Sequence, residues 1–283
     1  MIGPVLVVGG GRCGLQLARS LAAAGVDVTV TSHGVLSMRR ARSFGLPIRA
    51  QEMAVAAART ILLAVPDDVL HHGDTLRLGT ATPPAVVLHT SGLHPGRVLE
   101  GIAPPGCPLG SFHPLVSFPS PAGTLVSLKG RWAALEGDPQ AVRRARRLAR
   151  TLGMASSEVP TEMKSRYHAA AAVAANLTHT LTVVARSQLE QAGLSRKQAG
   201  QVLAPLVAEA TSAALQASGW EALTGPLARG DEGTLTAHRR ALPPEIWPAY
   251  AAVAHLAVAG LQHQGLLDAA TAENLMRALT ARD

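Results

Sequence analysis

Four polar residues recur along an alanine-rich segment, residues 161–191, that the sequence predicts to be one helix. If each residue advances a helix by about 100°, Lys164, His168, Asn176 and His179 lie within one arc of about 120°. Histidine titrates near neutral pH, and lysine, unlike arginine, can change its protonation state when it is buried. We expect Lys164 or His168 to transfer a proton or to bind substrate. Hydrogen-bonded helix packing or a solvent-facing side is the alternative.

Two further candidates lie near the ends of predicted strands. Ser91 follows a strand at residues 85–89, and His113 stands between Phe112 and Pro114 in the segment 109–119. Ligands of open α/β folds bind at the carboxyl ends of parallel strands. Ser91 is therefore a candidate neighbour of a cofactor or substrate, and His113 a candidate for orienting a carbonyl or carboxylate. A plain Ser-Gly turn and a loop histidine bonded to the backbone are the alternatives.

The stretch TGPLARGD, residues 224–231, combines a Gly-Pro turn with two charged side chains. Arg229 is a candidate clamp for an anion, with Asp231 as the partner that orients it. An ordinary connection between helices with a solvated ion pair deserves equal weight.

The element that must position these residues is a glycine loop near the start of the chain. Gly9, Gly11 and Gly14 fall on a G-x-G-x-x-G spacing between a predicted strand, residues 5–8, and a predicted helix, residues 15–24. In this fingerprint the first glycine permits a tight turn, the second lets the backbone approach a pyrophosphate, and the third lets the helix pack closely. The amides at the helix start then face the anion. The loop predicts a dinucleotide site.

The second predicted strand, residues 26–31, selects between the two nicotinamide dinucleotides. NAD-selective folds carry an acidic residue at its end, and here Ser32 and His33 follow, with Arg39 nearby. We expect NADP rather than NAD, although these arginines could simply coat a surface helix. The predicted cofactor site comprises Gly9, Gly11, Arg12, Cys13, Gly14, Ser32, His33, Arg39, Val65, Pro66 and Asp67.

Strands and helices alternate up to Pro160, with further strands predicted at residues 60–65, 85–89, 131–136 and 154–159. Helices alone follow, at residues 161–191, 195–218, 245–264 and 271–281. This order predicts an α/β fold. We expect an N-terminal Rossmann domain with a doubly wound, mostly parallel sheet at residues 1–160 and an all-helical substrate and dimerisation domain at residues 161–283.

Composition excludes several classes of protein. With 47% hydrophobic and 16% charged residues the chain is globular. The net charge of +7 invites a nucleic-acid interpretation, but the one dense basic run, residues 143–150, fits the solvated face of a helix better. Two cysteines are too few for a disulfide framework, which suggests a cytoplasmic protein. The alanine-rich stretches 169–185 and 249–261 contain polar residues and are expected to be buried helices rather than membrane spans.

Taken together, the motifs resemble a known group. These motifs are residues 9–14, 65–68, 91–92 and 112–115, Tyr167-His168 through Asn176, and Gly225-Pro226 through Arg229-Gly230-Asp231. The chain resembles bacterial Rossmann-like proteins with a helical C-terminal domain of unknown function, provisionally labelled NADP oxidoreductases. They are related to pyrroline-5-carboxylate reductase, 6-phosphogluconate dehydrogenase and ketopantoate reductase.

The resemblance implies that the C-terminal helices form a homodimer and close over the nicotinamide. In hydroxyacid dehydrogenases of this superfamily a lysine and an asparagine one turn later act on the substrate oxygen. Lys164 matches the lysine, whereas His168 stands where that asparagine would be. The basic residue that usually follows the second strand in NADP-dependent members is likewise replaced, by His33.

We therefore expect an NADPH-dependent oxidoreductase that reduces a C=O or C=N bond of a small carboxylate-bearing metabolite, such as a ketopantoate-like 2-keto acid or an imine. Lys164 or His168 would supply the proton, and Arg229 would hold the acidic group. His113, Ser91 and Asn176 would orient the acceptor. The alternative is a non-catalytic NADP-binding redox sensor. Neither a nucleic acid, a membrane nor a metal is expected as a partner.

Overall fold

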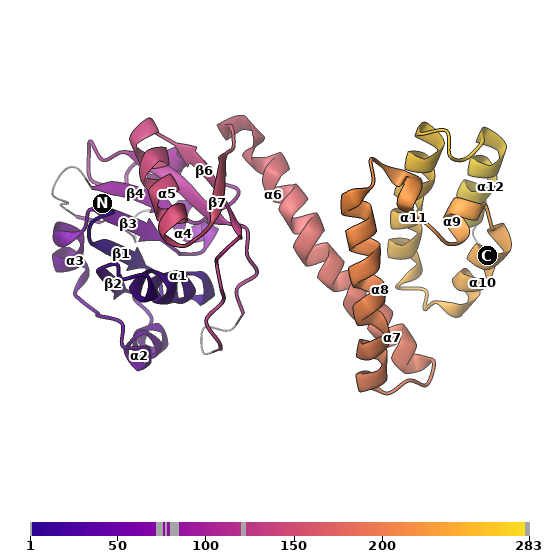
Figure 1. Ribbon diagram of the computed structural model, residues 1–283, viewed down its shortest axis with the longest axis horizontal. Helices are drawn as coiled ribbons and strands as arrows, with labels where there is room; N and C mark the ends of the chain where they lie inside the picture. The colour runs from indigo at the N-terminus through magenta and orange to yellow at the C-terminus, as the bar shows by residue number, and fades with distance from the viewer. Residues whose placement is uncertain (1, 72–75, 77, 80–84, 120–122, 281–283) are drawn as a thin grey trace. The chain divides into compact units, whose positions relative to one another are not determined.

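The computed structural model describes residues 2–71, 76, 78–79, 85–119 and 123–280. The chain divides into two compact units, Met1–Leu177 and Thr178–Asp283. The first unit contains the sheet, and the second consists of helices (Figure 1).

Seven strands form one sheet in the order β2-β1-β3-β4-β5-β6-β7. All neighbouring strands are parallel except β5 and β6, which are antiparallel. This confirms the predicted mostly parallel, Rossmann-like sheet, whose last strand ends two residues before Pro160. The strands are β1 (Val5–Val8), β2 (Val28–Thr31), β3 (Thr60–Leu63), β4 (Val86–His89), β5 (Leu109–Pro114), β6 (Trp132–Gly137) and β7 (Ala155–Glu158).

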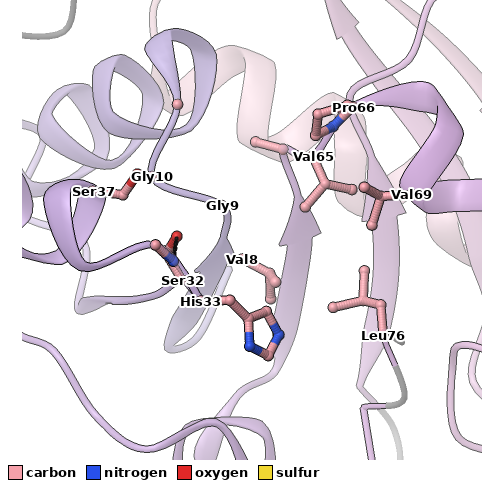
Figure 2. Close-up of a pocket in the computed structure, with 13 residues that line it drawn as sticks. Val8, Gly9, Gly10, Ser32, His33, Ser37, Val65, Pro66, Val69 and Leu76 are labelled. Atoms are coloured by element: carbon pink, nitrogen blue, oxygen red, sulfur yellow. Dashed lines mark hydrogen bonds between the residues drawn. The ribbon is translucent and has the colours of Figure 1, made fainter. Parts of the chain in front are cut away.

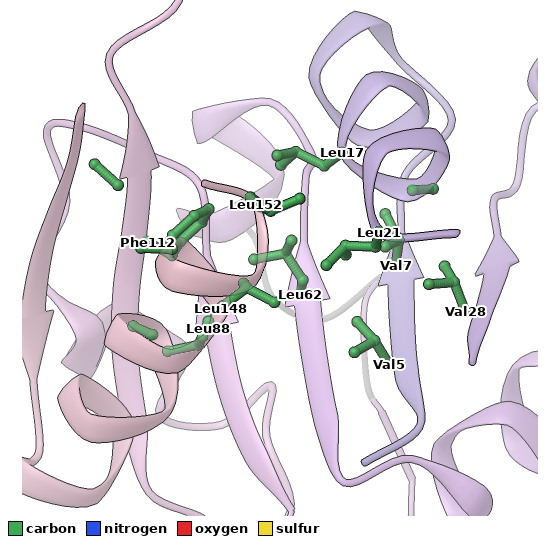
Figure 3. Packing of buried hydrophobic residues seen from close by; sticks show 14 of the residues in the cluster. Val5, Val7, Leu17, Leu21, Val28, Leu62, Leu88, Phe112, Leu148 and Leu152 are labelled. Atoms are coloured by element: carbon green, nitrogen blue, oxygen red, sulfur yellow. The ribbon is translucent and has the colours of Figure 1, made fainter. Parts of the chain in front are cut away.

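Helices cover both faces of this sheet (Figure 1), because successive strand residues point to opposite sides. Val5 and Val7 of β1 belong to one core, packed by α1 (Arg12–Ala23) and α5 (Pro139–Thr151) (Figure 3). Leu6 and Val8 belong to the other core, packed by α3 (Gln51–Ala57) and α4 (Asp67–His71). The double winding fixes α1, and with it the glycine loop, at the carboxyl edge of the sheet.

The basic run lies on α5, whose apolar side is buried as predicted, at Ala141, Val142, Ala145, Leu148 and Ala149. One of its arginines differs from the predicted solvated face. Arg144 donates hydrogen bonds to the carbonyls of Ile2 and Arg59 and to the Thr60 hydroxyl. Burial lowers the pKa of Arg144, and the neighbouring charges of Arg147 and Arg59 lower it further. This arginine joins α5 to the start of the sheet.

The segment predicted as one helix at residues 161–191 is not uniform. It begins with the 3₁₀ turn η3 (Thr161–Met163) and continues as α6 (Lys164–Ala172), the π-helical segment η4 (Val173–Leu177) and α7 (Thr178–Gln191). A π turn closes i→i+5 hydrogen bonds, so the 100° spacing does not hold beyond Val173. The expected burial of residues 169–185 was also wrong, since each is exposed or half-buried in this chain.

The second unit has its own apolar core. It contains α7, α8 (Arg196–Gln216), α9 (Pro226–Arg229), α10 (Glu232–Ala241), α11 (Trp247–His263) and α12 (Ala269–Thr280). Ser195 caps α8 through a capping box with Gln198, which explains where that helix begins. The core gathers Leu235, Ala251, Ala254, Val258, Leu261, Leu267, Ala272, Leu275 and Leu279. Among the residues that the structure describes, no helix is long and apolar enough to cross a membrane.

The connection between β5 and β6 is held against α1 by a buried glutamine. Gln16 is 1% exposed; its amide donates to the Thr124 carbonyl at 3.1 Å and accepts from the Val126 amide at 3.1 Å. The same connection contains Val116 and Phe118, which line a cavity at the site described below. Gln16 therefore fixes Thr124 and Val126 of this connection to the helix that follows the glycine loop.

Replacement of Gln16 by methionine should test this clamp. Gln16→Met keeps the side-chain volume but leaves the Val126 amide and the Thr124 carbonyl without their partner, so we expect a loss of about 1 to 2 kcal/mol in the free energy of unfolding. Urea unfolding measures the loss, and hydrogen exchange of the Val126 amide should accelerate. The exposed Gln262, changed to methionine, is the control and should shift stability by less than about 0.5 kcal/mol. Unchanged exchange at Val126 would disprove the clamp.

Candidate active site

The glycine loop has a physical reason for each of its three spaced glycines. Gly9 has a φ of +115°, and a Cβ there would lie 2.3 Å from the Ala64 carbonyl oxygen. A Cβ on Gly14 would lie 2.1 Å from the carbonyl oxygen of Gly9, so only glycine lets α1 begin this close to the turn. A Cβ on Gly11 would meet nothing within 4 Å. The backbone at Gly11 is therefore open to a ligand.

A cavity of about 510 Å³ opens beside this loop (Figure 2). It brings together six residues predicted for the cofactor: Gly9, Gly11, Ser32, His33, Val65 and Pro66. Its other lining residues are Val8, Gly10, Gly34, Ser37, Ala64, Val69 and Leu76. No Asp or Glu is among these described lining residues. The loop therefore faces a pocket whose polar side is made of hydroxyl, imidazole and backbone groups.

Ser37, which belongs to α2 (Val35–Ser43), also lines the cavity but was not among the residues predicted from the sequence. A Cβ on Gly10 would lie 2.4 Å from the Ser37 Cβ, so α2 packs directly against the glycine loop. The sequence signal that could have identified Ser37 is a second hydroxyl residue five positions after Ser32. Conversely, the predicted Arg12 and Arg39 are exposed and do not line this cavity.

A second cavity, of about 250 Å³, shares Val65 with the first. Six predicted residues line it: Cys13, Val65, Asp67, Ser91, His113 and His168. Thr90, Gly92, Pro114, Val116 and Phe118 complete the lining. The structure thus brings together the nucleotide loop and the two histidines that the sequence placed 55 positions apart.

His113 is the most constrained of these side chains. Its Nδ1 lies 2.7 Å from the Tyr167 hydroxyl, and its ring centroid lies 6.0 Å from that of His168. A Cβ on Gly92 would lie within 3 Å of both imidazole rings, so this glycine leaves the space that they occupy. Burial, aided by His168 and Lys164, lowers the pKa of His113 to about 4, and burial raises the pKa of Tyr167 to about 12. Near neutral pH the pair is an uncharged imidazole and a protonated phenol.

A third cavity, of about 400 Å³, continues from these histidines along α6. Asn176 lines it from the π-helical segment, so the structure does bring Asn176 to the side of His168. π turns are frequent at functional sites, because they change which residues a helix presents. The remaining lining residues are Pro114, Leu115, Val116, Ser117, Ala171, Ala172, Ala174 and Ala175.

Ser91 is held by a histidine that the sequence analysis missed. His89, fully buried at the end of β4, donates from Nε2 to the Pro95 carbonyl at 3.2 Å and accepts from the Ser91 amide at 3.1 Å through Nδ1. Burial lowers the pKa of His89 to about 3, so the ring stays neutral. The Ser91 Oγ accepts from the amides of Leu93 and His94, each at 3.2 Å. Among the residues that the structure describes, the Ser91 hydroxyl donates no hydrogen bond.

Lys164 lies apart from all three cavities. It is 2% exposed, its Nζ donates to the Ser111 hydroxyl at 2.9 Å, and the nearest Glu136 carboxylate oxygen is 4.0 Å away. Burial lowers the pKa of Lys164, while the Glu136 carboxylate raises it. Thr161, at the start of the same segment, donates its hydroxyl proton to Glu136 at 2.9 Å. The Lys164 amine thus belongs to a buried network of polar side chains with Ser111, Glu136 and Thr161.

The remaining predicted site residue, Arg229, belongs to the second unit. It is exposed at the end of α9. Its expected partner Asp231 caps α10, accepting from the Thr234 amide at 3.0 Å and from the Thr234 hydroxyl at 2.6 Å. These hydrogen bonds lower the pKa of Asp231 more than the nearby Arg229 does. Asp231 therefore has a structural role as a helix cap.

Comparison with known proteins agrees with this architecture. Residues 132–257 match the model of a family described as a domain of unknown function (DUF2520). No curated protein matches the sequence. Among solved structures, a Bacteroides fragilis protein provisionally named an NADP oxidoreductase has a TM-score of 0.74 and 23% identity, over 90% of this chain and 97% of its own.

Two functionally described proteins are more distant in sequence. The 1-pyrroline-5-carboxylate reductase of Streptococcus pyogenes has a TM-score of 0.62 and 12% identity, covering 99% of both chains. The reductive aminase of Aspergillus terreus, solved with NADPH and ethyl-5-oxohexanoate, has a TM-score of 0.59 and 16% identity, over 98% of this chain and 92% of its own. The chain thus has the Rossmann-like fold of these proteins, as the resemblance in its motifs implied.

Proposed function

We propose that this protein is an NADPH-dependent oxidoreductase that reduces a C=O or C=N bond of a small metabolite. The observation that carries the proposal is that two cavities share Val65 in their linings: one borders the glycine loop, and the other holds His113 and His168. A nucleotide site adjacent to titratable side chains is the arrangement that cofactor-dependent reduction requires. The NADPH complex of the structurally similar reductive aminase supports this choice.

The residues present fit the cofactor. A Cβ at Gly11 would meet nothing within 4 Å, which leaves open space where the pyrophosphate would meet the start of α1. Val65, Val69 and Leu76 offer an apolar wall for the adenine. Ser32, Ser37 and His33 would hold the ribose and its 2′-phosphate, and no acidic side chain among the described lining residues would repel that phosphate. When bound, the cofactor supplies the hydride.

The side chains of the second cavity would manage the proton. His168 would donate it to the substrate oxygen or nitrogen. The Tyr167 phenol, which stays protonated, can donate to His113 Nδ1, leaving the imidazole proton on Nε2 to bind the acceptor atom. The hydroxyl of Ser91 and the amide of Asn176 would orient the rest of the substrate. Lys164 contributes from beneath the site rather than by touching the substrate.

The charge of the cavity linings limits how a substrate carboxylate could be bound. Among the described residues that line the three cavities there is no lysine or arginine. A carboxylate-bearing substrate, such as a 2-keto acid or a cyclic imino acid, would therefore need a cation from outside these cavities. We keep Arg229, an exposed cation, as the candidate for binding such a carboxylate.

We also propose that the chain forms a homodimer through α7 and α8, which pack against each other in the second unit. These helices expose Leu181, Val202 and Leu206, at 43%, 48% and 58%, and Leu215 at 87%. Exposed apolar side chains gathered on one pair of helices are typical of a surface that a partner covers. A second copy would bury them.

Ser32→Asp should reverse the preference for the cofactor. A carboxylate at the end of β2 repels a 2′-phosphate but accepts hydrogen bonds from a free ribose, so we expect NADPH to bind at least about 10-fold more weakly and NADH not to weaken. Isothermal titration calorimetry with each dinucleotide measures both affinities. Ser43→Asp, at the far end of α2, is the matched control. An unchanged ratio of the two affinities would contradict the assignment of Ser32.

His168→Gln and His113→Gln should separate chemistry from cofactor binding. We expect each to lower kcat by about 10²-fold, while NADPH affinity is unchanged because neither residue lines the nucleotide cavity. NADPH consumption is followed with a panel of 2-keto acids, aldehydes and cyclic imines. His263→Gln, exposed at the end of α11, is the control. Tight NADPH binding with no turnover by the unmodified protein across the panel would favour the redox sensor instead.

Leu181→Glu combined with Leu206→Glu should produce a monomer. Light scattering is expected to give twice the mass of one chain for the unmodified protein and the mass of one chain for the double variant, because a dimer would have to bury two charges from each chain in the interface. Leu36→Glu, exposed on α2 of the first unit, should leave the mass unchanged. A monomeric unmodified protein would overturn the dimer.

A further inference from the structure

One buried carboxylate connects four segments of the first unit. Glu136 of β6 is 7% exposed, and its Oε2 accepts from the Gly96 amide at 2.7 Å. Its Oε1 accepts from the Thr161 hydroxyl at 2.9 Å. The hydroxyl of Ser111 lies 3.4 Å from Oε2 and receives the hydrogen bond from Lys164. Glu136 thereby joins β6, β5, the 3₁₀ turn η2 (Gly96–Leu99) and the helical segment that begins at Thr161.

The position of this network relates it directly to the histidines. Ser111 and His113 are two residues apart on β5 and so point to the same side of the sheet, while Phe112 points into the opposite core. Ser111 pairs in register with Glu136 across the antiparallel ladder. On α6, Lys164, Tyr167 and His168 are at spacings of three and four residues and share one face.

Two side-chain contacts therefore tie one face of α6 to one side of β5. Lys164 reaches Ser111 at 2.9 Å, and one turn later Tyr167 reaches His113 at 2.7 Å. The first contact is anchored by Glu136, whose carboxylate also fixes the turn that precedes α6 through Thr161. A displacement of Lys164 would move Tyr167 and His168 together, because they belong to the same helical turn.

We propose that Glu136 is a positioning residue of the site: through Lys164 and Thr161 it sets the place of the helix that carries Tyr167 and His168 against the strand that carries His113. The expected loss of turnover rests on the proposed reductase function, whereas the positioning of α6 against β5 does not. Lys164 acts with Glu136 as the buried cation of the pair, which explains why a lysine in this helix is enclosed rather than presented to a substrate.

The charge of Lys164 has a second effect on the site. Lys164 lowers the pKa of His113, together with burial and His168, whereas Asp67 raises it. Two further titratable groups face His113: Tyr167, which stays protonated, and His89, which burial keeps neutral. A lysine held in place by Glu136 therefore helps keep His113 uncharged near neutral pH, so removal of the cation should raise the pKa of His113.

The test compares Glu136→Gln, Lys164→Met and the double variant Glu136→Gln with Lys164→Met. In histidine-labelled protein, nuclear magnetic resonance reports the tautomer and titration of His113, assigned with His113→Gln. We expect altered His113 signals in every variant and a raised pKa of His113 wherever Lys164 is absent. Isothermal titration calorimetry should give unchanged NADPH affinity, because no member of the pair lines the nucleotide cavity. Turnover should fall about 10²-fold in kcat with an unchanged KM for NADPH.

Glu158→Gln is the matched control, since Glu158 forms an exposed ion pair with Arg146 on the neighbouring strand β7. It should leave the His113 signals and turnover as they are. Should Glu136→Gln alone not fold, the double variant, which buries no unpaired charge, still decides the question. Wild-type His113 signals and titration in the folded variants would overturn the positioning role. Absence of turnover in the unmodified protein would instead overturn the reductase, because the resonance measurement does not depend on a substrate.

Discussion

Parallel pairing of the first five strands is the constraint on which the rest of the structure depends. Because β1 to β5 run in one direction, the residues that follow them meet at a single edge of the sheet. The glycine loop follows β1, Ser32 follows β2, Val65 follows β3 and Ser91 follows β4, while His113 stands near the end of β5. Cavities that bring these residues together are the direct result of that shared direction.

Close packing decides what each of these positions can be. Gly9 and Gly14 let α1 start within van der Waals distance of β1 and β3, and Gly92 leaves room for two imidazole rings. The same closeness removes water from the histidines, so that His89 and His113 remain uncharged, the first as a purely structural group and the second facing a cavity. Burial thus keeps both histidines neutral, although only His113 faces a cavity in which it could bind a ligand.

Much of the fold could be predicted from the sequence. The six strands predicted with stated bounds appear within two residues of their expected ends, because short apolar runs bounded by glycine, proline or polar residues specify buried strands locally. The segment 109–119 contains β5, which ends at Pro114. The predicted helix at residues 161–191 was wrong in detail. No sequence period marks the π turn at Val173–Leu177, since alanine tolerates both helix types. The sequence also gives no sign that the Thr161 hydroxyl binds the carboxylate of Glu136, which lies 25 positions earlier in the chain.

What the sequence determined by itself is local: the glycine loop, the strand that ends without an acidic residue, and the presence of histidines and a lysine at particular spacings. Tertiary structure decided which of these side chains meet. His113 lies against Tyr167 and His168, Asn176 lines the cavity beside His168, and Lys164 is enclosed by Ser111 and Glu136. The reason is that a side chain's environment depends on segments distant in the chain, whereas turns, strands and helix starts depend on neighbours within a few residues.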